Sequence, residues 1–418
     1  MDVAEPRRGR LESLLNLARV RRGWSRAQLA RALDRDPTKI LPDSANPKLD
    51  YVIKLAEVLE WPVGEVVDAI WSGYEAAGNG APASFEQLNE QIAGAVRNAD
   101  YAAVVDLSQK MFRAARTPDE RAHACVREAA GWDGMGRYQK VLDAVRRGLA
   151  QAGISTRLRL VLQASLANAQ YTLWDLTPAL GTAEVLADWY EANPPTRDVD
   201  QKRVAYVYYV RGNTRRCLMT VEPDAASAHA ERAHADLSKA AAMYESLAQA
   251  FNDHGLRGVA NTCKGGLMEV DVEMGRLEPL AAVTQIRAAL DASGLPGADL
   301  PGDWIESYGW WCIFGSNIAL RHLKGRDLQQ SLNHLTAKAL EIAERLDNWA
   351  MRERVYTIQY ALHTLMVDAT GLELALDIDD QDRSLITATM GRFPAFRETG
   401  WRLLDSAKAL RFSKEAAR

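Results

Sequence analysis

The sequence predicts an all-α fold in two parts, a small N-terminal bundle and a long array of helix pairs. Apolar residues recur at helical spacing in most segments, and from Phe85 onward no segment shows the alternation or the β-branched run of a strand. A stretch rich in Gly, Ala, Asn and Pro, residues 72–84, is typical of a linker. We therefore expect a first domain over residues 1–71, a repeat domain over 85–412 and a tail at 413–418.

The composition is that of an ordinary globular protein, with 418 residues, 47% of them hydrophobic and 25% charged. No uninterrupted apolar stretch approaches the length of a membrane span, and the N-terminus lacks the apolar core of a signal peptide. We therefore expect a cytoplasmic protein without membrane contact. The four cysteines are far apart and lack metal or disulfide spacing, which predicts reduced, buried thiols.

The first domain is expected to contain five short helices. Apolar residues at i, i+3, i+4 and i+7 mark the first, namely Leu11, Leu14, Leu15 and Ala18. Ser25 and Gln28 stand where two side chains can cap the second helix reciprocally. Asp36 is expected to cap a third helix, which Pro42 limits to little over one turn because proline removes a donor and clashes backward. The fourth helix follows Asn46-Pro47, and the fifth spans residues 63–71.

Two runs in this domain, R-R-G-W-S-R-A-Q-L-A and N-P-K-L-D-Y-V-I-K-L-A-E-V-L-E-W, resemble the lambda-repressor/Cro-like helix-turn-helix family. In that family the second helix crosses the DNA backbone and the third enters the major groove. The resemblance implies duplex DNA as a partner. It also implies which positions contact DNA: Ser25, Arg26, Gln28, Thr38 and Lys39.

Charge is distributed unevenly in the first domain. Residues 1–40 carry ten Lys and Arg against five Asp and Glu, whereas residues 41–71 carry two against six. Because the whole chain has a net charge of −4, any phosphate contact is expected to be local to the basic half. Between Ile40 and Asn46 the chain is about three residues shorter than the family pattern and carries an acid. Two alternatives therefore stay open, a DNA-contacting face and a merely solvated one.

The segment A-A-G-W-D-G-M-G-R-Y, residues 129–138, is similar to a tetratricopeptide repeat, which needs small residues at helix crossings, a turn glycine and a packing aromatic. Looser versions recur at irregular separations that exceed the ideal repeat of about 34 residues. They begin near Leu173, Glu273 and Leu323. The second domain is therefore expected to be an α-solenoid of degenerate tetratricopeptide-like helical pairs.

One detail recurs in the first helix of four successive pairs, an asparagine after a small residue. The four are Asn168, Asn213, Asn261 and Asn317, and three have a cation one turn on, at Arg216, Lys264 and Arg321. Amides can hold the backbone of an extended peptide, and the cations can take its acidic groups. We expect a peptide or protein ligand in the groove. The alternative is that these asparagines bond within the array or cap turns.

An aromatic run, Trp304 to Phe314, indicates either a ligand-facing wall or, more in keeping with the usual burial of tryptophan, core or a subunit contact. No catalytic or metal-binding constellation emerges, because His229 and His234 are five residues apart and the aspartates at 377–382 lack the glycine and glutamate of a calcium loop. We expect neither an enzyme nor a cofactor.

The combined architecture resembles the Rap/Rgg/PlcR/PrgX class of bacterial peptide-sensing regulators. That resemblance implies a bacterial or phage-type transcriptional regulator, typically a homodimer, in which a peptide bound by the repeats controls DNA binding. The alternative is an interaction scaffold whose helix-turn-helix domain has lost sequence-specific DNA reading. The short third helix favours the scaffold, and the basic first half opposes it.

Overall fold

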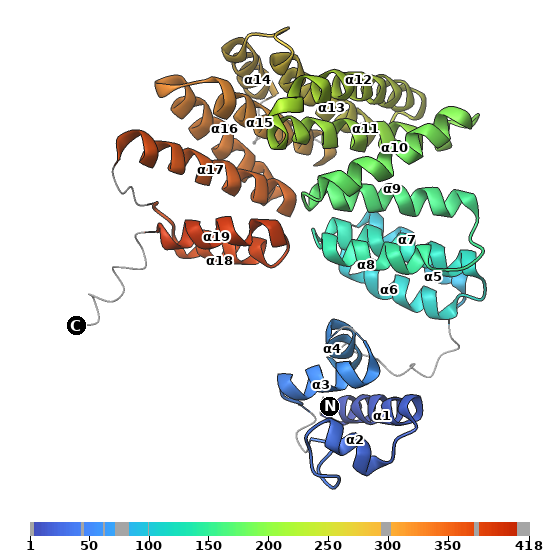
Figure 1. Ribbon diagram of the computed structural model, residues 1–418. Coiled ribbons are helices and arrows are strands. Elements are labelled where there is room, and N and C mark those ends of the chain that lie inside the picture. The colour runs from blue at the N-terminus through green and yellow to red at the C-terminus, as the bar shows by residue number, and fades with distance from the viewer. Residues whose placement is uncertain are drawn as a thin grey trace. The chain divides into compact units, whose positions relative to one another are not determined.

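The computed structural model describes residues 4–42, 46–61, 63–71, 83–98, 100–293, 302–371 and 376–407. The chain forms two compact units, Met1–Pro82 and Ala83–Arg418. The prediction of an all-α fold is confirmed, since the described residues contain helices, turns and a single β-bridge between Leu376 and Ala407 (Figure 1). None of the described helices combines the length and the apolar character that crossing a bilayer requires.

The first unit contains four helices among its described residues: α1 (Ala4–Arg22), α2 (Arg26–Ala32), α3 (Leu49–Leu59) and α4 (Val63–Trp71). The apolar stripe predicted for the first helix is buried, together with Leu29, Tyr51 and Leu55 from the next two helices. The expected reciprocal cap of α2 is confirmed. The Ser25 hydroxyl accepts from the Gln28 amide, and the Gln28 side chain accepts from the Ser25 amide at 2.8 Å.

The short third helix expected after Asp36 is instead a series of turns over residues 33–41. Asp36 does cap this segment, because its carboxylate accepts from the Thr38 amide at 2.8 Å, and Lys39 closes one turn on the Asp36 carbonyl. With Pro42 coming so soon after, a helix would have almost no further amide to bond. The fourth expected helix begins at Leu49, two residues after Pro47.

The second unit is a long succession of paired helices. Its elements are α5 (Phe85–Arg97), α6 (Tyr101–Ala114), α7 (Pro118–Gly134), α8 (Tyr138–Leu149), α9 (Thr156–Thr172), α10 (Leu176–Ala192), α11 (Asp198–Val221), η1 (Pro223–Ala225), α12 (Ala226–Phe251), α13 (His254–Glu273), α14 (Pro279–Ser293), α15 (Gly302–His322), α16 (Gly325–Arg345), α17 (Trp349–Thr370), α18 (Asp380–Met390), η2 (Pro394–Phe396) and α19 (Arg397–Asp405). Neighbouring helices pack against each other, and α7, α9, α11, α13, α15 and α17 also contact one another in that order. We call these six the inner helices.

The succession returns on itself, so that the start of the array meets its end (Figure 1). A Cβ added to Gly136, in the turn between α7 and α8, would lie 2.8 Å from the Trp349 Cβ on α17. Tyr138 packs against Phe393 with ring centroids 5.9 Å apart, and both join one hydrophobic cluster with α7, α8 and α17. We call this junction the seam.

Gly136 also performs the role expected of a repeat-turn glycine, since its φ of +63° is one that residues with a Cβ rarely adopt. Residues 72–82 of the expected linker and the expected tail at 413–418 lie outside the described residues. Ser84, at the end of the linker range, caps α5 through a reciprocal bond pair with Gln87.

Candidate functional site

The four asparagines singled out in the sequence lie on four inner helices, α9, α11, α13 and α15. Asn213 and Asn261 are buried, and Asn168 and Asn317 are partly buried. The structure therefore places them on successive helices of one kind. Their contacts separate them into two groups.

Arg216, Asn317 and Arg321 meet at one buried carboxylate, Glu269 of α13, and Asn213 joins them through Arg216. Its two oxygens accept from Arg216 Nη1 and from Arg321 Nη2, each at 2.6 Å, and Asn317 Nδ2 lies 3.4 Å from the first of these oxygens. The Asn213 amide oxygen accepts from Arg216 Nε at 3.1 Å. We call this set the Glu269 network.

Charge in the Glu269 network is compensated inside the protein. The Glu269 side chain is 1% exposed and that of Arg216 is 5% exposed. Burial by itself lowers the pKa of Arg216, but the Glu269 carboxylate and neighbouring Cys217 and Tyr171 outweigh it, so the net shift is upward. Arg321 has a second partner in Glu273, at 3.4 Å. Both guanidinium groups are therefore paired with carboxylates of the chain.

The remaining predicted ligand residues do not join this network. Asn261 donates to the Ser307 hydroxyl at 2.8 Å, and its carbonyl accepts from the Trp311 indole at 2.7 Å. Lys264 is half exposed and pairs with Glu245 at 2.5 Å. At Asn168 the backbone carbonyl accepts from the Thr172 hydroxyl at 2.8 Å.

A cavity of about 410 Å³ opens beside the Glu269 network and is lined by the inner helices α11, α13, α15 and α17 and by η2 and α19. Arg216, Glu269 and Asn317 border it on one side. Apolar side chains dominate its walls, among them Trp174, Trp310, Ile313, Leu320 and Phe396. The size and the mixture of apolar walls with a few polar groups are typical of a ligand-binding cavity. We call it the central cavity.

A second buried ion pair, Glu353 with Arg354 on α17, lies in the wall of the central cavity. The Arg354 guanidinium stacks on the Trp174 ring at 4.0 Å and donates to the Thr172 carbonyl at 3.2 Å. The Trp174 indole donates to Glu353 at 3.3 Å. Because Thr172 ends α9 and Trp174 lies just after it, these contacts hold the end of α9 against α17.

The aromatic run expected at Trp304 to Phe314 serves two roles on α15. Cys312, Ile313 and Phe314 are buried in the core. Ile313 also lines the central cavity, and the Arg216 guanidinium lies 4.4 Å from the centre of the Phe314 ring. Trp310 reaches the central cavity. Sequence spacing alone does not separate these roles, because residues of both kinds are contiguous.

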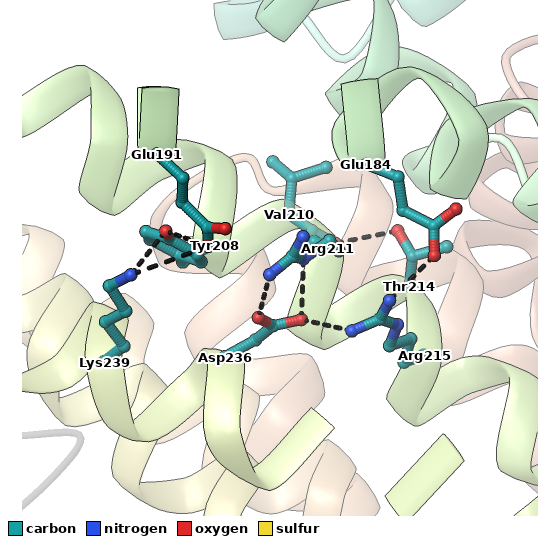
Figure 2. Close-up of polar contacts among 9 residues, drawn as sticks. All are labelled: Glu184, Glu191, Tyr208, Val210, Arg211, Thr214, Arg215, Asp236 and Lys239. Carbon is teal, nitrogen blue, oxygen red and sulfur yellow. Dashed lines mark hydrogen bonds and ion pairs between the residues drawn. The ribbon is translucent and has the colours of Figure 1, made fainter. Parts of the chain in front are cut away.

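A polar network on another face of α11 fixes its orientation (Figure 2). Arg211 and Arg215, one turn apart, both donate to the buried carboxylate of Asp236 on α12, at 2.6 to 2.9 Å. Arg215 also reaches Glu184 on α10 at 2.7 Å. Because these bonds hold one face of α11, Asn213 and Arg216, three residues apart on another face, are held toward Glu269.

All five positions that the sequence predicts to contact DNA are exposed in the first unit. Most already have partners within that unit. Ser25 and Gln28 cap α2, the Arg26 guanidinium donates to the Pro37 carbonyl at 2.9 Å, and Thr38 bonds to Asp36. Lys39 is exposed one residue beyond Thr38. Because Arg26 donates to Pro37 through Nε and is exposed, the end of its side chain stays accessible.

Several other cations of the basic half stabilise the bundle itself. Arg10 donates to the Ile70 carbonyl at 3.0 Å, Arg22 donates to the Val58 carbonyl at 2.8 Å, and Arg35 lies over the Tyr51 ring. Arg22 also pairs with Glu60 at 2.9 Å. The excess of positive charge in residues 1–40 is therefore partly used for packing.

Groups suited to other chemistry are dispersed. Within the described ranges, no set of His, Cys, Asp and Glu side chains is arranged to hold a metal ion. His229 lies 2.9 Å from Glu222, and His234 lies 3.5 Å from Asp271. All four cysteines are buried free thiols.

No protein-family model matches this chain, and no curated protein sequence matches it. Among solved structures, the chain is similar to PlcR of Bacillus thuringiensis in its complex with the peptide PapR7 and DNA. The two are 16% identical, the match covers 68% of this chain and 95% of that one, and the TM-score is 0.35. A similarity of this extent leaves the function to be argued from the site.

Proposed function

We propose that this chain is a homodimeric transcriptional regulator of the cytoplasm. Its helical repeats take a peptide or protein segment into the central cavity, and the bound segment controls DNA binding by the first unit. The observation that carries the proposal is the central cavity itself. It is bordered by the inner helices α11, α13, α15 and α17 and by η2 and α19, so a segment bound there contacts the middle and the C-terminal end of the array at once. Trp174 and Arg354, which hold the end of α9 against α17, also line the cavity, so ligand binding bears on that contact.

Within this proposal, Asn317 is the amide best placed to bond a ligand backbone, because it lines the central cavity and is only partly buried. Truncating it to alanine is expected to weaken ligand binding by the net worth of one hydrogen bond, about 1 kcal/mol. The other three asparagines remain proposals of the same kind. For Asn213 and Asn261, a ligand would have to compete with the partners they already have.

The ligand proposal is tested by filling the cavity. Full-length protein is incubated with an equimolar pool of random heptapeptides, passed through a gel-filtration column, and the retained peptides are identified by mass spectrometry. Ala361 lines the central cavity, so Ala361→Phe should abolish retention. Ala102→Phe, at an exposed position of α6, should leave it unchanged. Equal retention by both variants, or none by the parent protein, would refute the proposal.

DNA binding is tested by electrophoretic shift of random duplex DNA at several salt concentrations. Replacing Arg26 and Lys39 together by alanine should weaken binding and flatten the salt dependence by up to about two units of logarithmic slope. The matched control is Lys110→Ala with Arg116→Ala, which removes two exposed cations from the second unit. Unchanged slope in the first pair would exclude Arg26 and Lys39 from the DNA site.

The scaffold alternative is favoured by one observation, the turns that replace the third helix at residues 33–41. A turn segment presents fewer side chains to a major groove than a helix does. Absence of any shift with the parent protein at low salt would favour the scaffold. Dimer formation is tested by light scattering on the full chain over a range of concentrations, where a concentration-independent monomer would contradict it.

A further inference from the structure

A second cavity, of about 460 Å³, lies on another side of α17, between α16, α18 and α19. It is distinct from the central cavity, although Ile358 lines both. Its walls come from two hydrophobic clusters of the second unit, with Leu332 and Leu340 on one side and Ile386 and Leu403 on the other. We call it the α17–α18 cavity.

One buried polar atom in this cavity has no partner. Tyr356 is 3% exposed and lines the cavity, and its hydroxyl bonds to no described residue. Leaving a buried hydroxyl unpaired destabilises the folded protein. A phenylalanine would fill the same space without that cost. The hydroxyl is therefore a group that a bound molecule can satisfy.

Two carboxylates and one histidine, His363, line the cavity. Asp377 and Asp382 both border it, and neither lysine nor arginine is among the described lining residues. Asp382 is half-buried, and burial, together with the charge of Asp379, raises the pKa of its carboxyl. An anionic ligand would be repelled here, whereas a cationic group would be attracted.

We infer that the α17–α18 cavity binds a small, mainly apolar molecule carrying an amine, with the apolar body between α16 and α18 and the amine toward Tyr356 and Asp382. A protonated amine donates hydrogen bonds and has no acceptor to offer. The Tyr356 hydroxyl can accept one of these bonds, and the Asp382 carboxylate can accept another. The cavity volume falls within the range of small-molecule sites, and the apolar walls supply the remaining affinity.

This site is independent of the peptide ligand proposed above, because the two cavities open on different sides of α17 and share only Ile358 among their described lining residues. Failure of one proposal therefore leaves the other standing.

The test uses three molecules of matched shape that differ in charge: 4-phenylbutylamine, 4-phenylbutanol and 5-phenylpentanoate. Binding to the full chain is measured by saturation-transfer NMR and isothermal titration. We expect the amine to bind at least about tenfold more tightly than the carboxylate, with the alcohol between them. Comparable binding of amine and carboxylate, or no binding of the amine, would overturn the inference.

Two variants then test which side chains bind the amine. Tyr356→Phe should weaken the amine and the alcohol about equally, while leaving the stability of the free protein unchanged or raised, since the hydroxyl it removes has no partner. Asp382→Asn should weaken the amine about tenfold but not the alcohol. Tyr190→Phe, at a buried tyrosine of α10 outside the cavity, is the matched control. Amine binding that survives both cavity substitutions would place it elsewhere on the protein.

Discussion

Replacing Glu269 by glutamine removes the one charge that two guanidinium groups share, without changing the size of the side chain. Arg216 would lose its carboxylate partner at 2.6 Å while remaining 5% exposed. Arg321 would lose a bond of the same length but keep Glu273 at 3.4 Å, and it is more exposed, at 18%. Most of the cost therefore falls on Arg216.

The expected loss is about 3–5 kcal/mol in the free energy of unfolding of the second unit, the range for breaking a buried ion pair from one side. The control is Asp106→Asn, which breaks the ion pair with Lys110 on the surface of α6, where the two side chains are 56% and 45% exposed. That change should cost at most about 1 kcal/mol, since water screens the pair and the residues stay solvated.

The assay is urea unfolding followed by far-ultraviolet circular dichroism, supported by hydrogen exchange of the α11 and α13 amides so that unfolding of the first unit is not mistaken for the effect. Replacing both members of the pair, with Arg216→Met and Glu269→Leu together, should recover most of the lost stability because no uncompensated charge remains beside α13. A cost of Glu269→Gln no greater than that of Asp106→Asn would refute the reasoning, as would a double variant as unstable as the single one.

Three further predictions concern other parts of the second unit. Asp133 is an exposed residue, but desolvation by the surrounding protein and the charge of Glu306 raise the pKa of its carboxyl from 3.8 to about 6. Its contribution to stability is therefore complete below about pH 4 and is lost as the pH rises through 6. Asp133→Asn should therefore gain stability relative to the parent protein between about pH 4 and pH 7 in urea titrations, and a pH-independent difference would contradict this. Gly136→Ala should destabilise the protein more than Gly153→Ala, because both glycines have positive φ but only Gly136 faces a neighbour, Trp349. Equal midpoints of urea unfolding for the two variants would exclude a contact at the seam. Burial raises the pKa of the Cys263 and Cys312 thiols to about 12. A disulfide reagent at neutral pH should therefore modify these two thiols only as fast as the protein opens.

Local signals in the sequence predict the helices and where they start, because a helix cap forms between residues three positions apart. The Ser25–Gln28 cap has this property, and it forms as expected. The same locality misleads at Asp36, where a good cap is followed too soon by Pro42 and produces a turn. A capping residue indicates where a helix can begin, whereas the length of the helix depends on the residues beyond its first turn.

The site can be predicted only in part. The recurrence of asparagine and cation identifies Asn213, Arg216, Asn317 and Arg321, but it does not identify Glu269, the residue that unites them. Glu269 lies 53 residues from Arg216 and 48 from Asn317 along the chain, so no local pattern connects them. A weak signal does exist, since Glu269 is an acid that stands between the apolar residues Met268 and Val270.

The Glu269 network changes which kind of ligand group the central cavity can accept. The sequence predicts that Arg216 and Arg321 bind acidic groups of a ligand, yet each already has a carboxylate of the chain at 2.6 Å. An acidic ligand group would have to displace Glu269 and leave it buried without a partner, at a cost of several kcal/mol. Apolar contact carries no such cost, because Trp310 and Phe396 already line the cavity. For the ligand segment proposed above, we therefore expect an apolar side chain that contacts Trp310 and Phe396 and a backbone that bonds to Asn317.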